Sequence, residues 1–191
     1  VPSSQTITPA GTILKVDRNR PKDVAVSPDG HTIASLCIYQ ANFYTVNGTK
    51  INDAPLKGGP DGIAWSSDSK SVYMSEQNNQ IACMTMTGGE WRIARQITLT
   101  APTGTAADVA KRFSGDIQVS GLALAPDGKT LYAASAVLNA VLVIDVASNT
   151  VTRIVPVQMV PFYMALSKDG NILYVSNAGG PPQKPGDVSQ K

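Results

Sequence analysis

The sequence predicts an all-β fold, namely a β-propeller of four-stranded antiparallel blades, of which this chain forms an incomplete portion of about half a ring. The first observation is a stretch, Ser120–Val157, in which four short β-type runs alternate with turn residues. The second is a turn motif centred on aspartate that recurs along the chain. The third is composition, because two glutamates stand against twelve aspartates, as expected for a protein made of strands and turns.

The stretch Ser120–Val157 serves as the reference blade. Its expected strands are Leu122–Ala125, Thr130–Ser135, Ala140–Val146 and Thr150–Val157. Pro126-Asp127-Gly128 joins the first two strands and Ser148-Asn149 joins the last two, and both sequences favour hairpin turns. Four antiparallel strands in about 40 residues match one propeller blade.

The turn after the first strand repeats through the chain. It reads Ser27-Pro28-Asp29-Gly30, Ser66-Ser67-Asp68-Ser69, Ala125-Pro126-Asp127-Gly128 and Ser167-Lys168-Asp169-Gly170. A similar second strand follows each turn, at Thr32–Leu36, Ser71–Ser75, Thr130–Ala134 and Ile172–Ser176. Later hairpin turns keep the same period at Asn47-Gly48, Gly88-Gly89 and Ser148-Asn149. Several markers with one period indicate tandem β units.

These repeats divide the chain. We expect an orphan outer strand at 6–17, full blades at 21–57, 60–100 and 119–157, an insertion at 101–118, half a blade at 161–178 and a loop or tail at 179–191. Within the insertion, Thr105–Phe113 is expected to form a short helix with Thr105 as its N-cap and Gly115 beyond its end.

The two ends of this pattern leave two architectures open. An orphan strand followed by three and a half blades predicts the first half of a larger ring, whose remaining half, in a C-terminal segment or a second chain, would be the main partner. The alternative is a compact four-bladed ring, which would leave unpaired strand edges.

One residue run resembles a known repeat. Leu173-Tyr174-Val175-Ser176-Asn177, with weaker copies at Leu131–Ser135 and Val72–Glu76, is similar to the YVTN-type repeat of bacterial and archaeal propellers. The resemblance implies a seven-bladed ring. The order of Thr8–Gly11, Arg20–Gly30 and Tyr174–Asp187 further resembles the propeller of bacterial proteins that carry a downstream phosphoesterase domain of the alkaline phosphatase superfamily. That resemblance implies catalytic residues outside this chain, and no position here matches their motifs.

Candidate ligand-binding residues come from one face of the expected ring. In a propeller, the connections between blades and those between second and third strands emerge on the same face, around the channel mouth. The residues expected there are Arg20, Asp23, Asp61, Glu76, Ser120, Phe162, Tyr163 and Asn177. They would bind a small polar ligand, a cation or a protein, or they would cap strand ends and face water.

Other chemistry is weakly represented. His31, the single histidine, follows a tight turn on the opposite face, and with the separate Cys37 and Cys83 it makes neither a zinc site nor a catalytic relay. The cysteines are expected to be buried apolar residues, with a bridge between them as the alternative. Asn47-Gly48-Thr49 matches a glycosylation acceptor but is better explained as a hairpin turn.

The sequence therefore predicts a recognition module with no catalytic residues of its own, no metal site and no identifiable cofactor. A net charge of +2 and scattered basic residues argue against nucleic acid, and no run suits a membrane span. A chain that begins at Val1 suggests a processed, periplasmic or secreted protein. The alternative is the propeller part of a metal-dependent phosphoesterase or of a periplasmic dehydrogenase.

Overall fold

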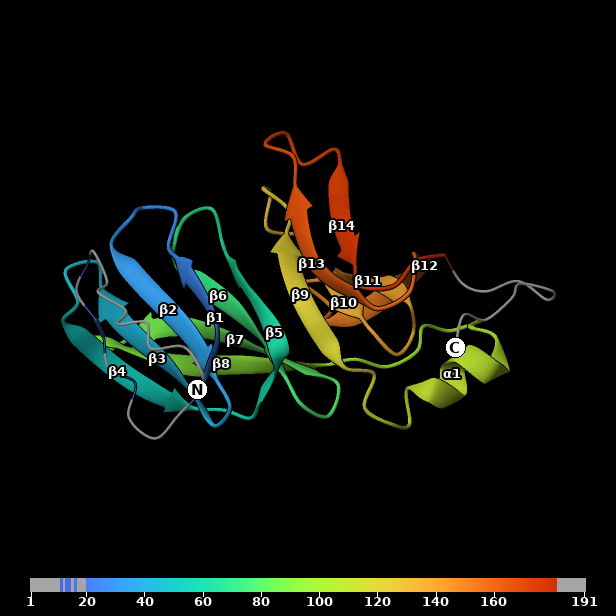
Figure 1. Cartoon of the computed structure of the whole chain (residues 1–191), viewed down its shortest axis with the longest axis horizontal. Coiled ribbons are helices and arrows are strands. Elements are labelled where there is room, and N and C mark those ends of the chain that lie inside the picture. The colour runs from blue at the N-terminus through green and yellow to red at the C-terminus, as the bar shows by residue number, and fades with distance from the viewer. Residues whose placement is uncertain (1–10, 12, 15, 17–19, 182–191) are drawn as a thin grey trace, which may run out of the picture.

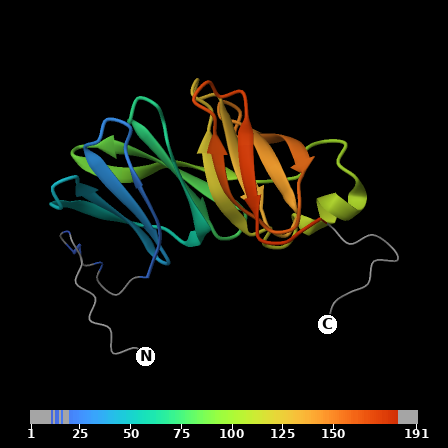
Figure 2. The same cartoon turned by 45° about the horizontal axis from the view of Figure 1, so that its top comes forward.

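The structure, a computed structural model, describes residues 11, 13, 14, 16 and 20–181. The predicted orphan strand at 6–17 lies largely outside the described residues, as does most of the predicted tail. The described chain forms antiparallel sheets that follow one another in sequence order, three of four strands and one of two (Figures 1 and 2). The predicted fold class, an all-β propeller of four-stranded blades, is confirmed.

We refer to these sheets as blades 1 to 4. Blade 1 contains β1 (Pro21–Val26), β2 (Thr32–Cys37), β3 (Gln40–Thr45) and β4 (Lys50–Pro55). Blade 2 contains β5 (Gly58–Trp65), β6 (Ser71–Glu76), β7 (Gln80–Thr87) and β8 (Glu90–Thr98). Blade 3 contains β9 (Val119–Leu124), β10 (Thr130–Ser135), β11 (Ala140–Asp145) and β12 (Thr150–Pro156). Blade 4 consists of β13 (Pro161–Leu166) and β14 (Leu173–Asn177).

Each full blade is a meander in which neighbouring strands pair antiparallel. Short turns suffice for this topology, and they use the residues that the sequence singled out. Gly48, Gly88 and Gly89 all have positive φ, between 62° and 86°, in the turns that join third to fourth strands. The hairpin interpretation of Asn47-Gly48 is therefore confirmed, because glycine adopts this left-handed conformation without steric cost.

The hydrophobic core lies between the blades. One cluster joins blades 1 and 2 and includes Leu36, Phe43, Met74 and Met84. Trp91 on β8 is 2% exposed in this cluster, stacked on Phe43 with ring centroids 5.2 Å apart. A second cluster joins blades 2 and 3 through residues such as Ile81, Ile97, Leu131 and Leu142. Blades 1, 2 and 3 therefore bury apolar faces against one another, as a repeat architecture requires.

The first strands of successive blades, β1, β5, β9 and β13, are neighbours toward the middle of the arrangement (Figure 1). Two glycines set how closely they approach. A Cβ on Gly62 would lie 2.3 Å from the backbone oxygen of Ser120, and one on Gly121 would lie 2.5 Å from that of Phe162. Because any larger residue would collide with backbone, these positions require glycine and bring the first strands together.

The insertion between blades 2 and 3 carries the helix α1 (Ala107–Arg112). The prediction of Thr105 as N-cap was wrong, because the helix is capped at Ala106 without a side-chain hydrogen bond. The Thr105 hydroxyl instead donates to the backbone oxygen of Pro102, 2.6 Å away, and closes the preceding turn. In the described part of the chain, no helix has the length and apolar character needed to cross a membrane.

Candidate functional site

The connections that precede each blade and those between second and third strands lie together on one face. The backbone N–H of Gly58 donates to Ile38 O, and that of Ala178 donates to Val160 O, so both kinds of connection are bonded to each other. Asn79 makes the most extensive link of this kind. Its carboxamide donates to Phe113 O and Gly115 O and accepts from Ile117 N, at 2.8 to 3.0 Å. We call this surface the connection face.

Two aspartates stand on the first strands next to this face. Asp23 on β1 is half-buried, and its Oδ2 accepts a hydrogen bond from Gly62 N on β5 at 3.1 Å. Asp61 on β5 is 9% exposed, and its backbone oxygen accepts from the Ser75 hydroxyl at 2.7 Å. Lys22 lies beside them, with its Nζ donating to Gly59 O at 2.8 Å.

The pKa values of both carboxyl groups are raised. Burial is the main cause for each, because it disfavours the charged form. For Asp23, hydrogen bonds from backbone N–H groups, including that of Gly62, oppose the rise. For Asp61, the negative charge of Asp23 adds to the rise and the positive charge of Lys22 opposes it. The charge of Asp23 therefore acts on the carboxyl group of Asp61.

Tyr163 on β13 joins the same group from blade 4. Desolvation, followed by the charges of Asp61 and then Asp23, raises the pKa of its phenol. Its ring packs edge-on against Phe162, with centroids 5.1 Å apart. A pocket of about 170 Å³ lies at this place, and residues of all four first strands line it, including Asp23, Gly62, Gly121 and Tyr163. We call Asp23, Asp61 and Tyr163 the inner-strand cluster.

The sequence profile of a family described as "Lactonase, 7-bladed beta-propeller" matches residues 26–180, which is most of the chain. The chain belongs to this family. The inner-strand cluster therefore lies in part of a seven-bladed ring, and the four-bladed alternative is not supported. No protein of curated function matches the chain in sequence.

Solved structures that resemble this lactonase-family chain share its fold at low sequence identity. Hydrazine synthase of Kuenenia stuttgartiensis matches with a TM-score of 0.69 and 21% identity, over 91% of this chain and 47% of that one. A functionally unknown protein from Desulfotomaculum acetoxidans matches with a TM-score of 0.65 and 15% identity, over 82% of this chain and 49% of that one. The WD40 repeats of RRP9 match with a TM-score of 0.62 and 19% identity, over 80% and 44% respectively. The chain thus spans about half the length of these structures, and the likeness concerns the fold.

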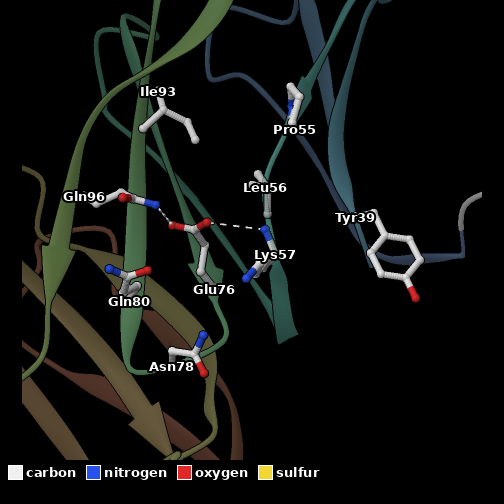
Figure 3. Close-up of a pocket in the computed structure, with 9 residues that line it drawn as sticks. All are labelled: Tyr39, Pro55, Leu56, Lys57, Glu76, Asn78, Gln80, Ile93 and Gln96. Carbon is white, nitrogen blue, oxygen red and sulfur yellow. Dashed lines mark hydrogen bonds between the residues drawn. The ribbon is translucent and has the colours of Figure 1, made fainter.

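Of the eight residues predicted to bind ligand, the structure groups Asp23, Asp61 and Tyr163, with Phe162 packed beside Tyr163. Glu76 lies elsewhere. It is the last residue of β6 and lines a separate pocket between blades 1 and 2, shown in Figure 3. Glu76 therefore lies in a different pocket from Asp23 and Tyr163.

The other three predicted residues do not line the pocket of Asp23 and Tyr163. Arg20 is exposed immediately before β1. The Ser120 hydroxyl is 1% exposed and donates to Pro161 O at 3.1 Å, which ties β9 to β13. Asn177 is half-buried at the end of β14, where its Nδ2 donates to Val175 O at 3.3 Å. Ser120 and Asn177 thus make contacts that support the strands.

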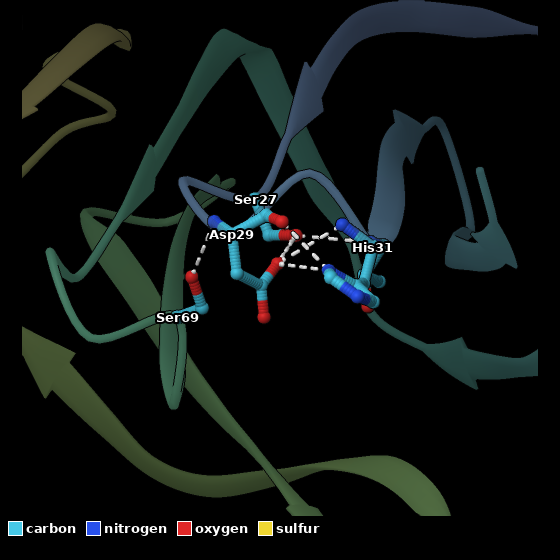
Figure 4. Close-up of polar contacts among 5 residues, drawn as sticks. Ser27, Asp29, His31 and Ser69 are labelled. Atoms are coloured by element: carbon cyan, nitrogen blue, oxygen red, sulfur yellow. Dashed lines mark hydrogen bonds and ion pairs between the residues drawn. The ribbon is translucent and has the colours of Figure 1, made fainter.

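His31 lies on the opposite face, as the sequence indicated, with a side chain that is 81% exposed. It follows the turn drawn in Figure 4, in which Asp29 Oδ1 accepts from the Ser27 hydroxyl at 2.5 Å and from His31 N at 3.0 Å. The Ser69 hydroxyl of the next blade accepts from Asp29 N at 3.0 Å. These turns therefore also link neighbouring blades.

Both cysteines are free and buried, so the alternative of a bridge is not found. Burial raises the pKa of the Cys37 thiol, and its sulfur accepts from Asn42 Nδ2 at 2.9 Å. Within residues 20–181 and the few described before them, no group of three or more His, Cys, Asp or Glu side chains could hold a metal ion.

Sequence reasoning missed the structural role of Asn79. The sequence signal was the repeat of an asparagine just before the third strand, since Asn139 occupies the equivalent turn of blade 3. Its Oδ1 likewise accepts a hydrogen bond, from Val160 N at 2.9 Å. Both asparagines have positive φ, 59° and 51°, a conformation that asparagine tolerates better than most residues. A repeated asparagine at the start of the third strand therefore marks this contact.

Proposed function

We propose that this chain contributes to a ligand-recognition site at the channel of a seven-bladed propeller, and that the ligand is a small polyhydroxylated molecule. The observation that carries the proposal is the pocket that Asp23 of blade 1 and Tyr163 of blade 4 line together, with Asp61 of blade 2 near enough for its charge to raise the pKa of Tyr163. Carboxylates accept several hydrogen bonds and so suit hydroxyl donors, and a tyrosine ring offers an apolar surface to a sugar-like ring.

The described pocket of about 170 Å³ is smaller than the range of about 300–1,000 Å³ that is usual for ligand sites. We propose that the remaining blades enlarge and close it. Exposed apolar residues at both ends of the array support this, because equivalent surfaces are buried between blades elsewhere. Val24 and Val26 on β1 are 63% and 53% exposed, and Ile172 and Tyr174 in blade 4 are 52% and 60% exposed.

A second candidate is hydrolysis of a lactone, which the description of the family favours. The raised pKa of Asp23 favours it as well, because a general base works best with a pKa near the working pH. Asp23 would take a proton from water as the water oxygen attacks the lactone carbonyl. The ring C–O bond would then break, and the ring oxygen would receive the proton to give the hydroxy acid.

The test uses the protein as its gene encodes it, with glucose and glucono-1,5-lactone as probes. Binding of glucose by calorimetry, lost in Tyr163→Ala and kept in the opposite-face variant His31→Gln, supports recognition. Ring opening of the lactone above the spontaneous rate, lost in Asp23→Asn, supports hydrolysis. If the protein binds neither probe and opens no lactone, both versions are overturned.

We also propose that the protein acts outside the cytoplasm. The finer resemblance to YVTN-type repeats and to propellers followed by a phosphoesterase domain stays a prediction, since the expected catalytic residues would lie beyond Lys191. Hydrolysis of p-nitrophenyl phosphate by the gene-encoded protein, dependent on a divalent metal, would support that alternative.

A further inference from the structure

A second pocket lies on the connection face, between blades 1 and 2 and away from the inner-strand cluster. Its volume is about 460 Å³, within the range of small-molecule sites. Its polar and apolar walls include Leu56, Lys57, Glu76, Gln80, Ile93 and Gln96 (Figure 3). All strands of the two blades that form it lie within the described residues.

Glu76 lies at the centre of this pocket and is only 4% exposed. Its Oε2 accepts a hydrogen bond from Gln96 Nε2 at 2.8 Å, and its Oε1 accepts a long one from Lys57 N at 3.4 Å. Among the ion pairs found in the described part of the chain, none includes Glu76. One good hydrogen bond thus serves a carboxylate that can accept about four.

Such a carboxylate is costly to bury without a positive partner. The surrounding groups do not remove this cost, because Gln96 and the backbone of Lys57 are neutral donors. The Lys57 side chain is exposed on the rim and makes no ion pair with Glu76. A cation that entered the pocket would therefore meet a preformed, largely desolvated counter-charge.

We propose that this pocket binds a small organic ammonium ion, with the ammonium on Glu76 and the hydrocarbon body against Leu56 and Ile93. A primary ammonium has three donors, of which Glu76 would accept at least one, and the side-chain amides of Gln80 and Gln96 line the same pocket. The apolar walls favour a ligand with a hydrocarbon body over an inorganic ion. A divalent metal ion is disfavoured, because a single carboxylate gives too few charged ligands.

The inference is independent of the proposed function at the channel, because the two pockets share no residue. The probe is phenethylamine, with 2-phenylethanol as an uncharged analogue of the same shape. In the full-length protein, we expect phenethylamine to shift the side-chain amide NMR signals of Gln80 and Gln96, and 2-phenylethanol to leave them unchanged.

Variants sharpen the test. Glu76→Gln keeps the shape of the side chain and should weaken phenethylamine binding about tenfold or more, because a charge-assisted hydrogen bond is lost. Glu90→Gln is the matched control, since Glu90 is an exposed glutamate paired with Arg92 in the same blade and does not line this pocket. Lys57→Met should strengthen binding by removing a repulsive charge from the rim.

Three results would overturn the proposal. The first is an equal response to the amine and the alcohol. The second is that Glu76→Gln binds phenethylamine as tightly as the wild-type protein does. The midpoint of denaturant unfolding must be the same for both proteins, which shows that the variant is folded. The third is binding that occurs only in Lys57→Met, which would mean that Lys57 already supplies the counter-charge in the natural protein.

Discussion

The carboxylate of Asp23 accepts a hydrogen bond from the backbone N–H of Gly62, with an Oδ2–N distance of 3.1 Å across the junction of blades 1 and 2. This bond joins two first strands. It also holds one carboxylate near another, because the charge of Asp23 contributes to the raised pKa of Asp61. One contact therefore serves both the assembly of the blades and the electrostatics of the inner-strand cluster.

The variant Asp23→Asn should lower the pKa of Asp61 and that of Tyr163. It removes a negative charge that raises both, and its Oδ1 can still accept from Gly62 N. Carboxyl-carbon NMR titration measures the change at Asp61, and ultraviolet absorbance in alkaline solution measures it for tyrosine. Asp29→Asn, in an exposed turn on the opposite face, is the control. An unchanged midpoint for Asp61 in Asp23→Asn would contradict the coupling.

The pH dependence of stability follows from the raised pKa values of Asp23 and Asp61. In the unfolded chain both groups return to their ordinary value, so between that value and the higher folded value the native state holds more protons. Their contribution to the free energy of unfolding is full below the ordinary value of 3.8 and is lost as the pH rises through the folded values. Replacing both by Asn should flatten this part of the stability curve, measured by urea unfolding at several pH values.

The exposed turn aspartates should behave in the opposite way. The Ser27 hydroxyl is the main cause that lowers the pKa of Asp29, and Ser167 does the same for Asp169. The stability they contribute is present above pH 3.8 and is lost as the pH falls through the folded values. In Ser27→Ala the pKa of Asp29 should rise, as seen by NMR titration.

Blade 3 offers the reverse experiment for this turn. There, Ala125 replaces the serine, while Asp127 Oδ1 still accepts from Lys129 N at 2.9 Å. We expect Ala125→Ser to increase the free energy of unfolding near neutral pH, with the gain fading in acid. An unchanged free energy of unfolding at neutral pH would show that the serine contributes little to the turn.

Gly62→Ala tests the close approach of the first strands. The new Cβ would lie 2.3 Å from Ser120 O, at a φ of +132° that alanine rarely adopts. Overpacking and backbone strain together should cost at least about 2 kcal/mol in the free energy of unfolding. Gly88→Ala is the control, because Gly88 also has positive φ but no atom lies within 4 Å of its added Cβ. Equal losses in the two variants would contradict the packing argument.

Asn79→Ala should loosen the insertion that carries α1. The change leaves Ile117 N and the carbonyls of Phe113 and Gly115 without their partner, at a cost of about 1–3 kcal/mol. Asn78→Ala is a close control, since Asn78 has nearly the same φ, 61° against 59°, and is exposed. Hydrogen exchange at Ile117 should accelerate in Asn79→Ala alone. Similar exchange in both variants would assign the effect to backbone conformation.

The sequence by itself determined the architecture, because propeller strands and turns are local. The alternation of β-type runs, the aspartate turns and the Asn-Gly and Gly-Gly hairpins each act over a few residues, and their period is visible without any long-range contact. The fourfold copy of one turn predicted the blades. It also placed His31 correctly on the face opposite the connections.

Only the tertiary structure decided which polar residues share a pocket. Glu76 lines a pocket between blades 1 and 2, whereas Asp23 of blade 1 and Tyr163 of blade 4 line another pocket beside the first strands. The reason is that each site is made across blade junctions, where distances depend on how closely Gly62 and Gly121 let neighbouring backbones approach. The sequence favoured Thr105 as the N-cap of α1. In the structure the Thr105 hydroxyl bonds to Pro102 O instead, and Ala106 is the N-cap.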